Sequence, residues 1–219
     1  MFVVRREGES RDEGTRRRRR PEEAERAILA AARSFLSEHP FREMKVESVM
    51  ARTGLSRPAF YAYFKDRYEL VTRLLEGIGG LLFAVDRRWL VGDPGVGREE
   101  SAVILREALR GGAETFERYG SVLRAISDAA SYDERVEEVY RFGLIERLTV
   151  AVAARIARDV EAGVSPPDLV PQETARALVF MTERYLIDAY GRPQGRRARD
   201  EILQTLERVW INTLYGGSC

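Results

Sequence analysis

Apolar residues recur three and four positions apart along most of the chain after residue 20. The first such segment starts at Pro21, and its apolar positions are Ala24, Ile28, Ala31, Ala32, Phe35 and Leu36. This spacing places them on one face of a helix. Similar periods cover residues 66–89, 98–116, 120–130, 133–162, 172–190 and 197–215. Since no window alternates with a period of two, the pattern predicts an all-α fold of about nine helices.

The stretch 46–65 predicts two short helices joined by a glycine turn. Gly54 supplies the positive φ that a helix C-terminus commonly needs, and Ser56 stands where its hydroxyl would cap the second helix. Pro58 falls in the first turn of that helix, where a missing N–H costs little. One small core can be shared by Val46, Val49, Met50, Leu55, Phe60 and Phe64. The pattern is that of a helix-turn-helix, and it predicts DNA binding.

The polar and aromatic residues left on the outer face of this motif are the candidate DNA contacts. Residues 57–63 are expected to enter the major groove, and phosphate contacts are expected from Lys45, Tyr61, Tyr63 and Lys65. The Arg57 guanidinium suits a guanine edge, although the sequence leaves open whether it reaches a base or a phosphate. An ordinary helical corner without DNA binding is the simpler alternative.

The basic charge of the chain is concentrated at its start. Residues 1–65 hold 15 of the 36 Lys and Arg and 10 of the 35 Asp and Glu, so they carry +5 and residues 66–219 carry −4. Residues 1–20 contain almost no apolar side chain after Val4, which predicts a disordered basic N-terminal arm. The run Arg16–Arg20 either follows the DNA backbone or minor groove, or is a solvated charge run.

Composition argues against several classes of protein. The chain has one cysteine, Cys219, and one histidine, His39, so neither an internal disulfide nor a Cys/His metal site is expected. No credible acid–base pair appears, and we expect neither enzymatic activity nor a cofactor. The longest apolar stretch, residues 78–85, is far shorter than the roughly 20 residues of a membrane helix. A cytoplasmic protein that does not enter the membrane is therefore expected.

The second half of the chain is rich in aromatic residues at helical spacing. Its members are Phe116, Tyr140, Phe142, Leu144, Leu148, Phe180, Met181, Tyr185 and Trp210, with Thr182 and Asn212 as isolated polar residues. They are either the core of a helix bundle or the lining of a cavity for a small hydrophobic ligand. Gly111 and Gly112 inside a helix either leave room for such a ligand or mark a close helix crossing.

The order of these parts resembles the TetR family of transcriptional regulators. The likeness runs from Ala24 to Phe35, through the motif at 46–56 and the stretch 57–65, to Glu69 and Leu70. It implies DNA contacts by Ser56, Arg57, Pro58, Ala59, Tyr61, Tyr63 and Lys65. A narrower likeness, to a mycobacterial repressor of that family, rests on residues 55–64, 181–184 and 209–216.

The resemblance implies a helix-turn-helix domain at 21–66 and a ligand-binding and dimerisation domain at 67–219. It further implies a homodimer formed by the last two helices, a near-palindromic double-stranded DNA operator, and release of this repressor by a small hydrophobic effector.

The narrower likeness places Phe116, Tyr140, Leu144, Thr182 and Trp210 at the cavity, and Leu148 and Tyr185 of the apolar cluster complete the candidate set. The relative's bulky aromatics are replaced near Leu105 and Gly112, and a polar amide by Val179. The rival hypothesis is a helical small-molecule-binding protein without DNA-binding activity.

Overall fold

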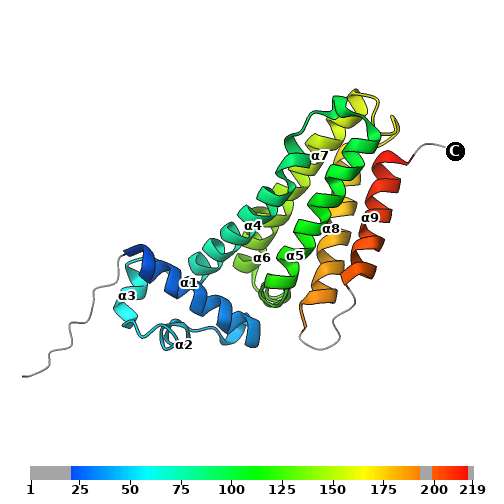
Figure 1. The fold of residues 1–219 in the computed structure, drawn as a ribbon. Coiled ribbons are helices and arrows are strands. Elements are labelled where there is room, and N and C mark those ends of the chain that lie inside the picture. The colour runs from blue at the N-terminus through cyan, green and yellow to red at the C-terminus, as the bar shows by residue number, and fades with distance from the viewer. Residues whose placement is uncertain (1–20, 193–198, 217–219) are drawn as a thin grey trace, which may run out of the picture.

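The computed structural model describes residues 21–192 and 199–216, which contain nine α-helices and no strand (Figure 1). The helices are α1 (Pro21–Glu38), α2 (Val46–Met50), α3 (Arg57–Tyr61), α4 (Arg67–Val91), α5 (Arg98–Ala130), α6 (Glu134–Tyr140), α7 (Glu146–Glu161), α8 (Pro171–Tyr190) and α9 (Arg199–Tyr215). The predicted all-α fold is confirmed. The expected arm, residues 1–20, lies outside the described residues. None of the described helices is long and apolar enough to cross a membrane.

Helices α1–α3 form a small unit at one end of an elongated bundle, and α4 runs from this unit into the bundle (Figure 1). The predicted shared core of α2 and α3 is present. Val49, Met50, Phe60 and Phe64 are buried, and Val46 and Leu55 pack against them while partly exposed. The buried face of α1 covers this core, as its periodic apolar residues predict.

Helix α5 differs from the prediction, because it continues for 33 residues where the sequence indicated a break between 116 and 120. Gly120 lies at the expected break. A Cβ there would come within 3.0 Å of the backbone of Tyr190 at the end of α8. The glycine therefore serves a close approach between α5 and α8, and the apolar face of α5 sustains the helix through it.

The segment 133–162 was predicted as one helix and is divided by a π-helical turn at Arg141–Ile145, which joins α6 to α7. The Glu146 N–H donates to the Arg141 carbonyl, five residues back, as expected of such a turn. This wider turn places Leu144 and Ile145 in the wall of the cavity described below. Hydrophobic periodicity alone does not distinguish such a turn from the α-helix around it.

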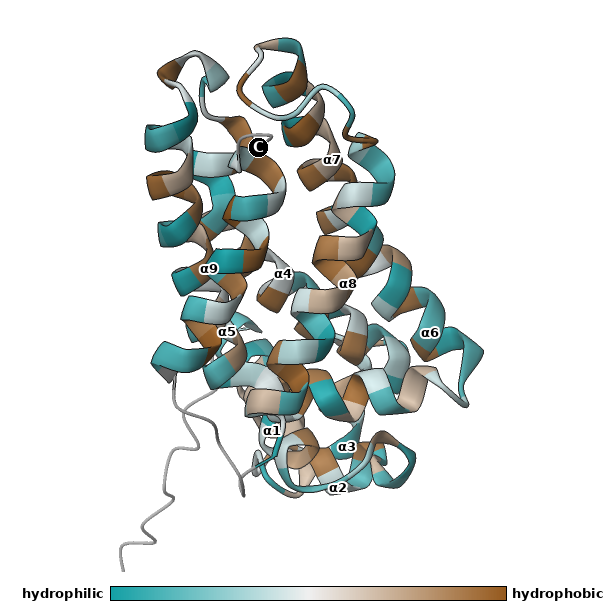
Figure 2. Ribbon diagram, turned by 90° about the vertical axis from the view of Figure 1, so that its right-hand side faces the viewer, coloured by the Kyte–Doolittle hydropathy of each residue, from teal (hydrophilic) through white to brown (hydrophobic). Residues whose placement is uncertain are grey.

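The bundle is formed by α4–α9, whose ribbons carry both apolar and polar positions (Figure 2), and the buried side chains between these helices are mostly apolar. A buried polar network closes the end of the bundle far from α1–α3. Arg155 and Asp159 of α7 are paired at 2.8 Å, Asp159 accepts from the Tyr215 hydroxyl at 2.9 Å, and that hydroxyl accepts from Trp89 Nε1 at 2.8 Å. Because each partner is satisfied, the network joins α4, α7 and α9 without an orphaned charge.

Candidate functional site

The turn between α2 and α3 has the predicted backbone, but Ser56 caps α3 differently than expected. Gly54 has φ +68°, as predicted. Ser56 occupies the N-cap position, yet its hydroxyl makes no capping hydrogen bond. The next-but-one residue is Pro58, which has no N–H, and the Ala59 N–H donates to the Ser56 carbonyl at 3.0 Å. The prediction of a hydroxyl cap was therefore wrong, and the Ser56 side chain remains exposed at the tip of the motif.

The eight candidate DNA contacts gather on and beside α3. The structure leaves Lys45, Ser56, Arg57, Pro58, Tyr61 and Lys65 exposed, while Ala59 and Tyr63 are partly buried against the small core. Tyr61 is 51% exposed. An aromatic side chain on a short helix that leaves half its surface in solvent contributes little to the fold, so it is available for contact with a partner.

Arg57 already has two partners within the motif, and neither was predicted from the sequence. Its Nε lies 3.0 Å from Glu47 Oε1 of α2, and its guanidinium lies over the Tyr61 ring, 5.9 Å from the centroid. The hydrogen bond to Tyr61 and the charge of Glu47 raise the pKa of Arg57. These contacts hold the guanidinium on the outer face of α3. Only the packing of α2 against α3 brings Glu47 to it.

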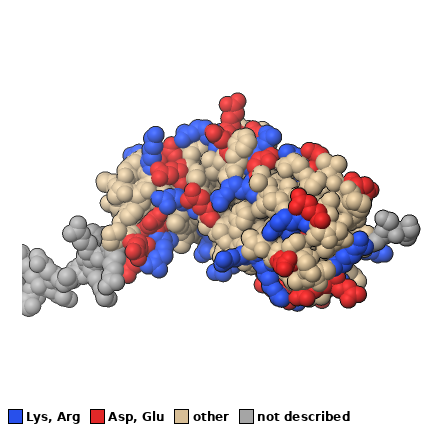
Figure 3. Space-filling view, turned by 90° about the horizontal axis from the view of Figure 1, so that it is seen from above, with Lys and Arg blue, Asp and Glu red and all other residues tan. Residues whose placement is uncertain are grey.

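Charge on this unit is nearly balanced. Residues 21–65 contain seven Lys and Arg and six Asp and Glu, so most of the +5 of the first 65 residues belongs to residues 1–20. Figure 3 likewise shows basic and acidic side chains mixed over one face of the molecule. The electrostatic attraction of α1–α3 for a polyanion is therefore local, at Lys45, Arg57 and Lys65.

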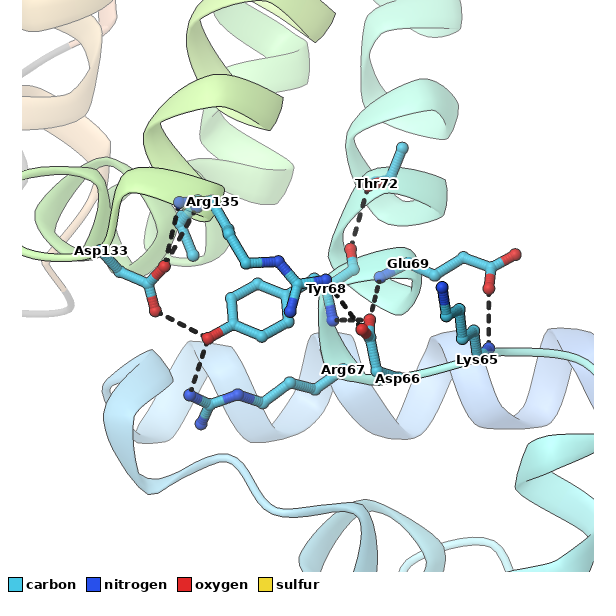
Figure 4. A network of polar contacts seen from close by, with 9 residues as sticks. Lys65, Asp66, Arg67, Tyr68, Glu69, Thr72, Asp133 and Arg135 are labelled. Atoms are coloured by element: carbon cyan, nitrogen blue, oxygen red, sulfur yellow. Dashed lines mark hydrogen bonds and ion pairs between the residues drawn. The ribbon is translucent and has the colours of Figure 1, made fainter.

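A polar junction connects the first turn of α4 to the first turn of α6 (Figure 4). Asp66 caps α4 as predicted, accepting from the N–H groups of Tyr68 at 2.9 Å and Glu69 at 3.0 Å. Arg135 of α6 donates to the same carboxylate at 2.8 Å and lies 3.7 Å from the centroid of the Tyr68 ring. The Tyr68 hydroxyl donates to Asp133 at 3.0 Å.

Electrostatics stabilise this junction. Burial by itself would raise the pKa of Asp66, but Arg135 and the two backbone N–H groups hold that pKa below its usual value. The Asp66 carboxylate also lowers the local helix energy by facing the positive end of the α4 dipole. This junction at Asp66, the N-cap of α4, is one of the contacts between the bundle and the α1–α3 unit, and the packing of α1 against α5 is another.

A mostly apolar cavity lies inside the bundle, with a free volume of about 80 Å³. Five helices and the π-helical turn contribute to its wall. The lining residues are Leu82, Asp86, Trp89, Leu105, Ala108, Leu109, Gly112, Phe116, Leu144, Ile145, Leu148, Val152, Val179, Thr182, Glu183, Leu186 and Trp210. This volume holds a few water-sized groups but not a drug-sized ligand, which needs about 300 Å³ or more. A larger ligand would have to move the helices apart.

Five of the seven predicted ligand contacts line this cavity, namely Phe116, Leu144, Leu148, Thr182 and Trp210. Tyr140 lies behind the wall and donates its hydroxyl to Glu183, while Tyr185 is partly buried and is not among the lining residues. Burial, together with the Glu183 carboxylate, raises the Tyr140 pKa well above its usual value, so this hydroxyl stays protonated. Leu105, Gly112 and Val179, the positions where the sequence departs from its relative, all face the cavity.

Asp86 and Trp89 of α4 also line the cavity and were not among the ligand contacts predicted from the sequence. Both follow Leu82 at i+4 and i+7, so the helical period places all three on one face of α4 and is the sequence signal for them. Gly111 and Gly112 were expected either to leave room for a ligand or to mark a close helix crossing, and the structure assigns one role to each. A Cβ on Gly111 would come 2.7 Å from Val85 Cβ of α4, so Gly111 permits a close crossing, whereas Gly112 has no atom within 4 Å and leaves room beside the cavity.

Family models match both parts of the chain. Residues 28–74 match the model of bacterial regulatory proteins of the tetR family, and residues 105–216 match the C-terminal domain of the transcriptional regulator EthR. The HTH-type transcriptional regulator EthR of Mycolicibacterium smegmatis is 29% identical over 212 residues, covering 92% of this chain and 91% of that protein. EthR of Mycobacterium tuberculosis H37Rv is 28% identical over 203 residues, covering 92% of each.

Solved structures share the fold at low sequence identity. A putative TetR-family regulator from Syntrophomonas wolfei has a TM-score of 0.75 and 16% identity, covering 91% of this chain and 98% of that chain. The fatty acid degradation regulator FadR from Bacillus halodurans has a TM-score of 0.71 and 10% identity, covering 86% and 94%. At these identities the likeness concerns the arrangement of helices.

Proposed function

This chain belongs to the TetR family of DNA-binding transcriptional regulators, with a C-terminal domain of the EthR type, and we propose that it is a repressor released from its operator by a small hydrophobic effector. One observation carries the proposal. Helix α4 begins at the junction with α1–α3 and contributes Leu82, Asp86 and Trp89 to the cavity wall. A ligand that widens the cavity therefore displaces the helix that positions the DNA reader.

Residues 21–66 act in this proposal as the DNA-binding domain and residues 67–219 as the ligand-binding and dimerisation domain. The DNA contacts are Lys45, Ser56, Arg57, Pro58, Ala59, Tyr61, Tyr63 and Lys65. Exposed polar and aromatic side chains at the start of α3 match the way that a recognition helix meets the major groove. The Arg16–Arg20 run would add phosphate contacts, because the rest of the domain is nearly neutral.

TetR regulators act as dimers, and we propose a homodimer formed by α8 and α9. Phe180 of α8 and Val209 of α9 are large apolar residues that remain 43% and 37% exposed. Figure 2 shows both helices on the side of the bundle that faces the viewer. A two-fold axis there would present two α3 helices to a near-palindromic operator, about 34 Å apart or a multiple of it.

Release follows from linkage between the two sites. The described cavity, at about 80 Å³, is the contracted form that accompanies DNA binding in this mechanism. Effector binding stabilises a wider bundle in which the two readers no longer match the groove spacing. Reciprocity requires operator DNA to weaken effector binding by the same factor.

The decisive experiment measures binding to DNA from the promoter region of the protein's own gene and to a random duplex of equal length, at about 150 mM salt. The proposal requires a salt-dependent preference for the promoter DNA, and release of that DNA by at least one compound from a hydrophobic panel. The variant Arg57→Ala with Tyr61→Ala should lose the preference. If that variant kept every activity of the protein, a helical small-molecule-binding protein without DNA binding would be the better description.

We propose no catalytic activity and no cofactor, since Thr182, the one hydroxyl among the lining residues, is held by Trp210 and no nucleophile stands beside a base in that lining. An α-helical enzyme would instead convert its bound ligand, which product analysis after incubation would detect. The protein's place of action in this proposal is the cytoplasm, where its DNA partner is found.

A further inference from the structure

A single carboxylate without a protein partner lies in the cavity wall. Asp86 is on α4, between Leu82 and Trp89 of the same wall. Burial raises the pKa of Asp86 to about 7, and no hydrogen bond or opposite charge among the described residues counters that effect. By solvent accessibility Asp86 is partly buried, with its side chain in the apolar cavity wall, and a carboxylate held there without a partner disfavours the folded state when ionised. Packing of the bundle therefore does not explain it.

The other polar groups in the wall already have partners. Trp210 Nε1 donates to Thr182 Oγ1 at 2.8 Å, and Trp89 Nε1 donates to the Tyr215 hydroxyl at 2.8 Å. Glu183 accepts from the Tyr140 hydroxyl. Asp86 is thus the lining group that is left for a ligand.

The sign of charge in the wall selects among ligands. Asp86 and Glu183 are its two ionisable residues, one on α4 and one on α8, and the lining residues include no Lys, Arg or His. In a low-dielectric cavity an ionised acid attracts a cation and repels a carboxylate strongly. The indole ring of Trp210 adds a surface that also favours a cationic group, while the neighbouring Trp89 ring already has the Arg155 guanidinium 5.5 Å from its centroid.

We propose that Asp86 is the recognition residue of this cavity and that the effector is a hydrophobic amine, with its ammonium group paired to the Asp86 carboxylate and its apolar body inside the bundle. This inference rests on the proposed function, because it names the class of compound that the same cavity takes. Asp86 belongs to α4, so the pair forms on the helix that reaches the DNA reader. Long-chain carboxylates are excluded as effectors.

The test uses three probes of equal chain length and different head charge, n-octylamine, 1-octanol and octanoate. The chain has two tryptophans, and both line the cavity, so intrinsic tryptophan fluorescence reports on this site alone. The expected order of affinity for the full-length protein at pH 7.5 is amine, then alcohol, then carboxylate. The amine should bind about tenfold or more tighter than the alcohol, as a charge-assisted hydrogen bond predicts.

Two substitutions test whether the preference for the amine probe comes from Asp86. Asp86→Asn keeps the shape and removes the charge, and it should lose about tenfold or more in amine affinity while octanol affinity changes less than about threefold. Glu76→Gln removes an exposed carboxylate of the same helix, and it should change neither the affinity for the amine nor the affinity for octanol. Circular dichroism checks that both variants are folded, and if Asp86→Asn is not, the comparison of the three probes on the unmodified protein decides.

Equal binding of the three probes, or full amine affinity in folded Asp86→Asn, would overturn the inference. The proposed function fails by a separate measurement, the absence of promoter preference without any ligand. A protein that binds its operator but is released by octanol or octanoate as readily as by octylamine keeps the proposed function and loses this inference.

Discussion

Arg135 of α6 donates a hydrogen bond to the Asp66 carboxylate at 2.8 Å, and the same carboxylate caps α4. One side chain of the proposed ligand-binding part is thus fixed to the residue at which the proposed DNA-binding part ends. The Tyr68 ring, 3.7 Å from the Arg135 guanidinium, completes the contact. A movement of α4 relative to α6 has to break or shift this junction, so we take it as the point where the two sites communicate.

Arg135→Ala is expected to reduce coupling while leaving both binding sites intact. The pair is partly exposed, so its loss should change stability little. We expect operator affinity without effector to stay within about threefold, and the fold-change caused by the releasing compound to fall by about threefold or more. Fluorescence anisotropy with labelled operator measures both. Arg88→Ala, which breaks the exposed pair between Arg88 and Glu107 farther along α4, is the matched control. Equal release in wild type and Arg135→Ala would remove the junction from the mechanism.

Glu47 is expected to restrain the main basic group of the recognition helix. Its carboxylate lies 3.0 Å from Arg57 Nε, and DNA phosphates near it would be repelled. Glu47→Gln should therefore tighten binding to random duplex by roughly threefold to tenfold and narrow the gap to the operator. Titrations of both duplexes at several salt concentrations measure the change, with Glu43→Gln as the exposed acidic control. A variant with unchanged random-duplex affinity would show that the pair does not matter for DNA.

Stability should respond to pH through Asp86. Its pKa is about 7 in the fold against 3.8 as the usual value, so the folded protein holds a proton that the unfolded chain has lost. Stability from this group is complete below about pH 4 and is lost as pH rises through about 7. Asp86→Asn should therefore match wild type near pH 4 and melt several degrees higher at pH 8. Thermal unfolding followed by circular dichroism at both pH values tests the sign, and a wild type that is the more stable protein at pH 8 would contradict it.

The adjacent glycines of α5 should respond oppositely to the same substitution. Gly111→Ala places a Cβ 2.7 Å from Val85 Cβ and should destabilise the protein by about 1 to 3 kcal/mol. Gly112→Ala meets no atom within 4 Å and should stabilise the helix by up to about 1 kcal/mol. Chemical denaturation of the two variants measures the difference. Equal effects would mean that α4 and α5 do not cross where the structure has them.

Local sequence determined most of the helices of this protein, but not the continuity of α5 or the π-helical turn at Arg141–Ile145. The 3.6-residue period fixed the buried faces of α1 and α4, Gly54 fixed the turn of the motif through its positive φ, and Asp66 fixed the start of α4 through its carboxylate. These features depend on residues within a few positions of one another, which is why they can be read from the chain. The family likeness then joined them into one architecture.

Tertiary structure decided what those elements present to each other. It set Glu47 against Arg57, left Tyr185 outside the cavity lining, assigned Gly111 to a helix crossing and Gly112 to the cavity, and placed Asp86 in an apolar wall. A period fixes which side of a helix is buried, but not which neighbour meets it or whether the space between them is filled. Contacts of about 3 Å between side chains far apart in sequence depend on how whole helices pack, so they cannot be predicted from the sequence of one segment.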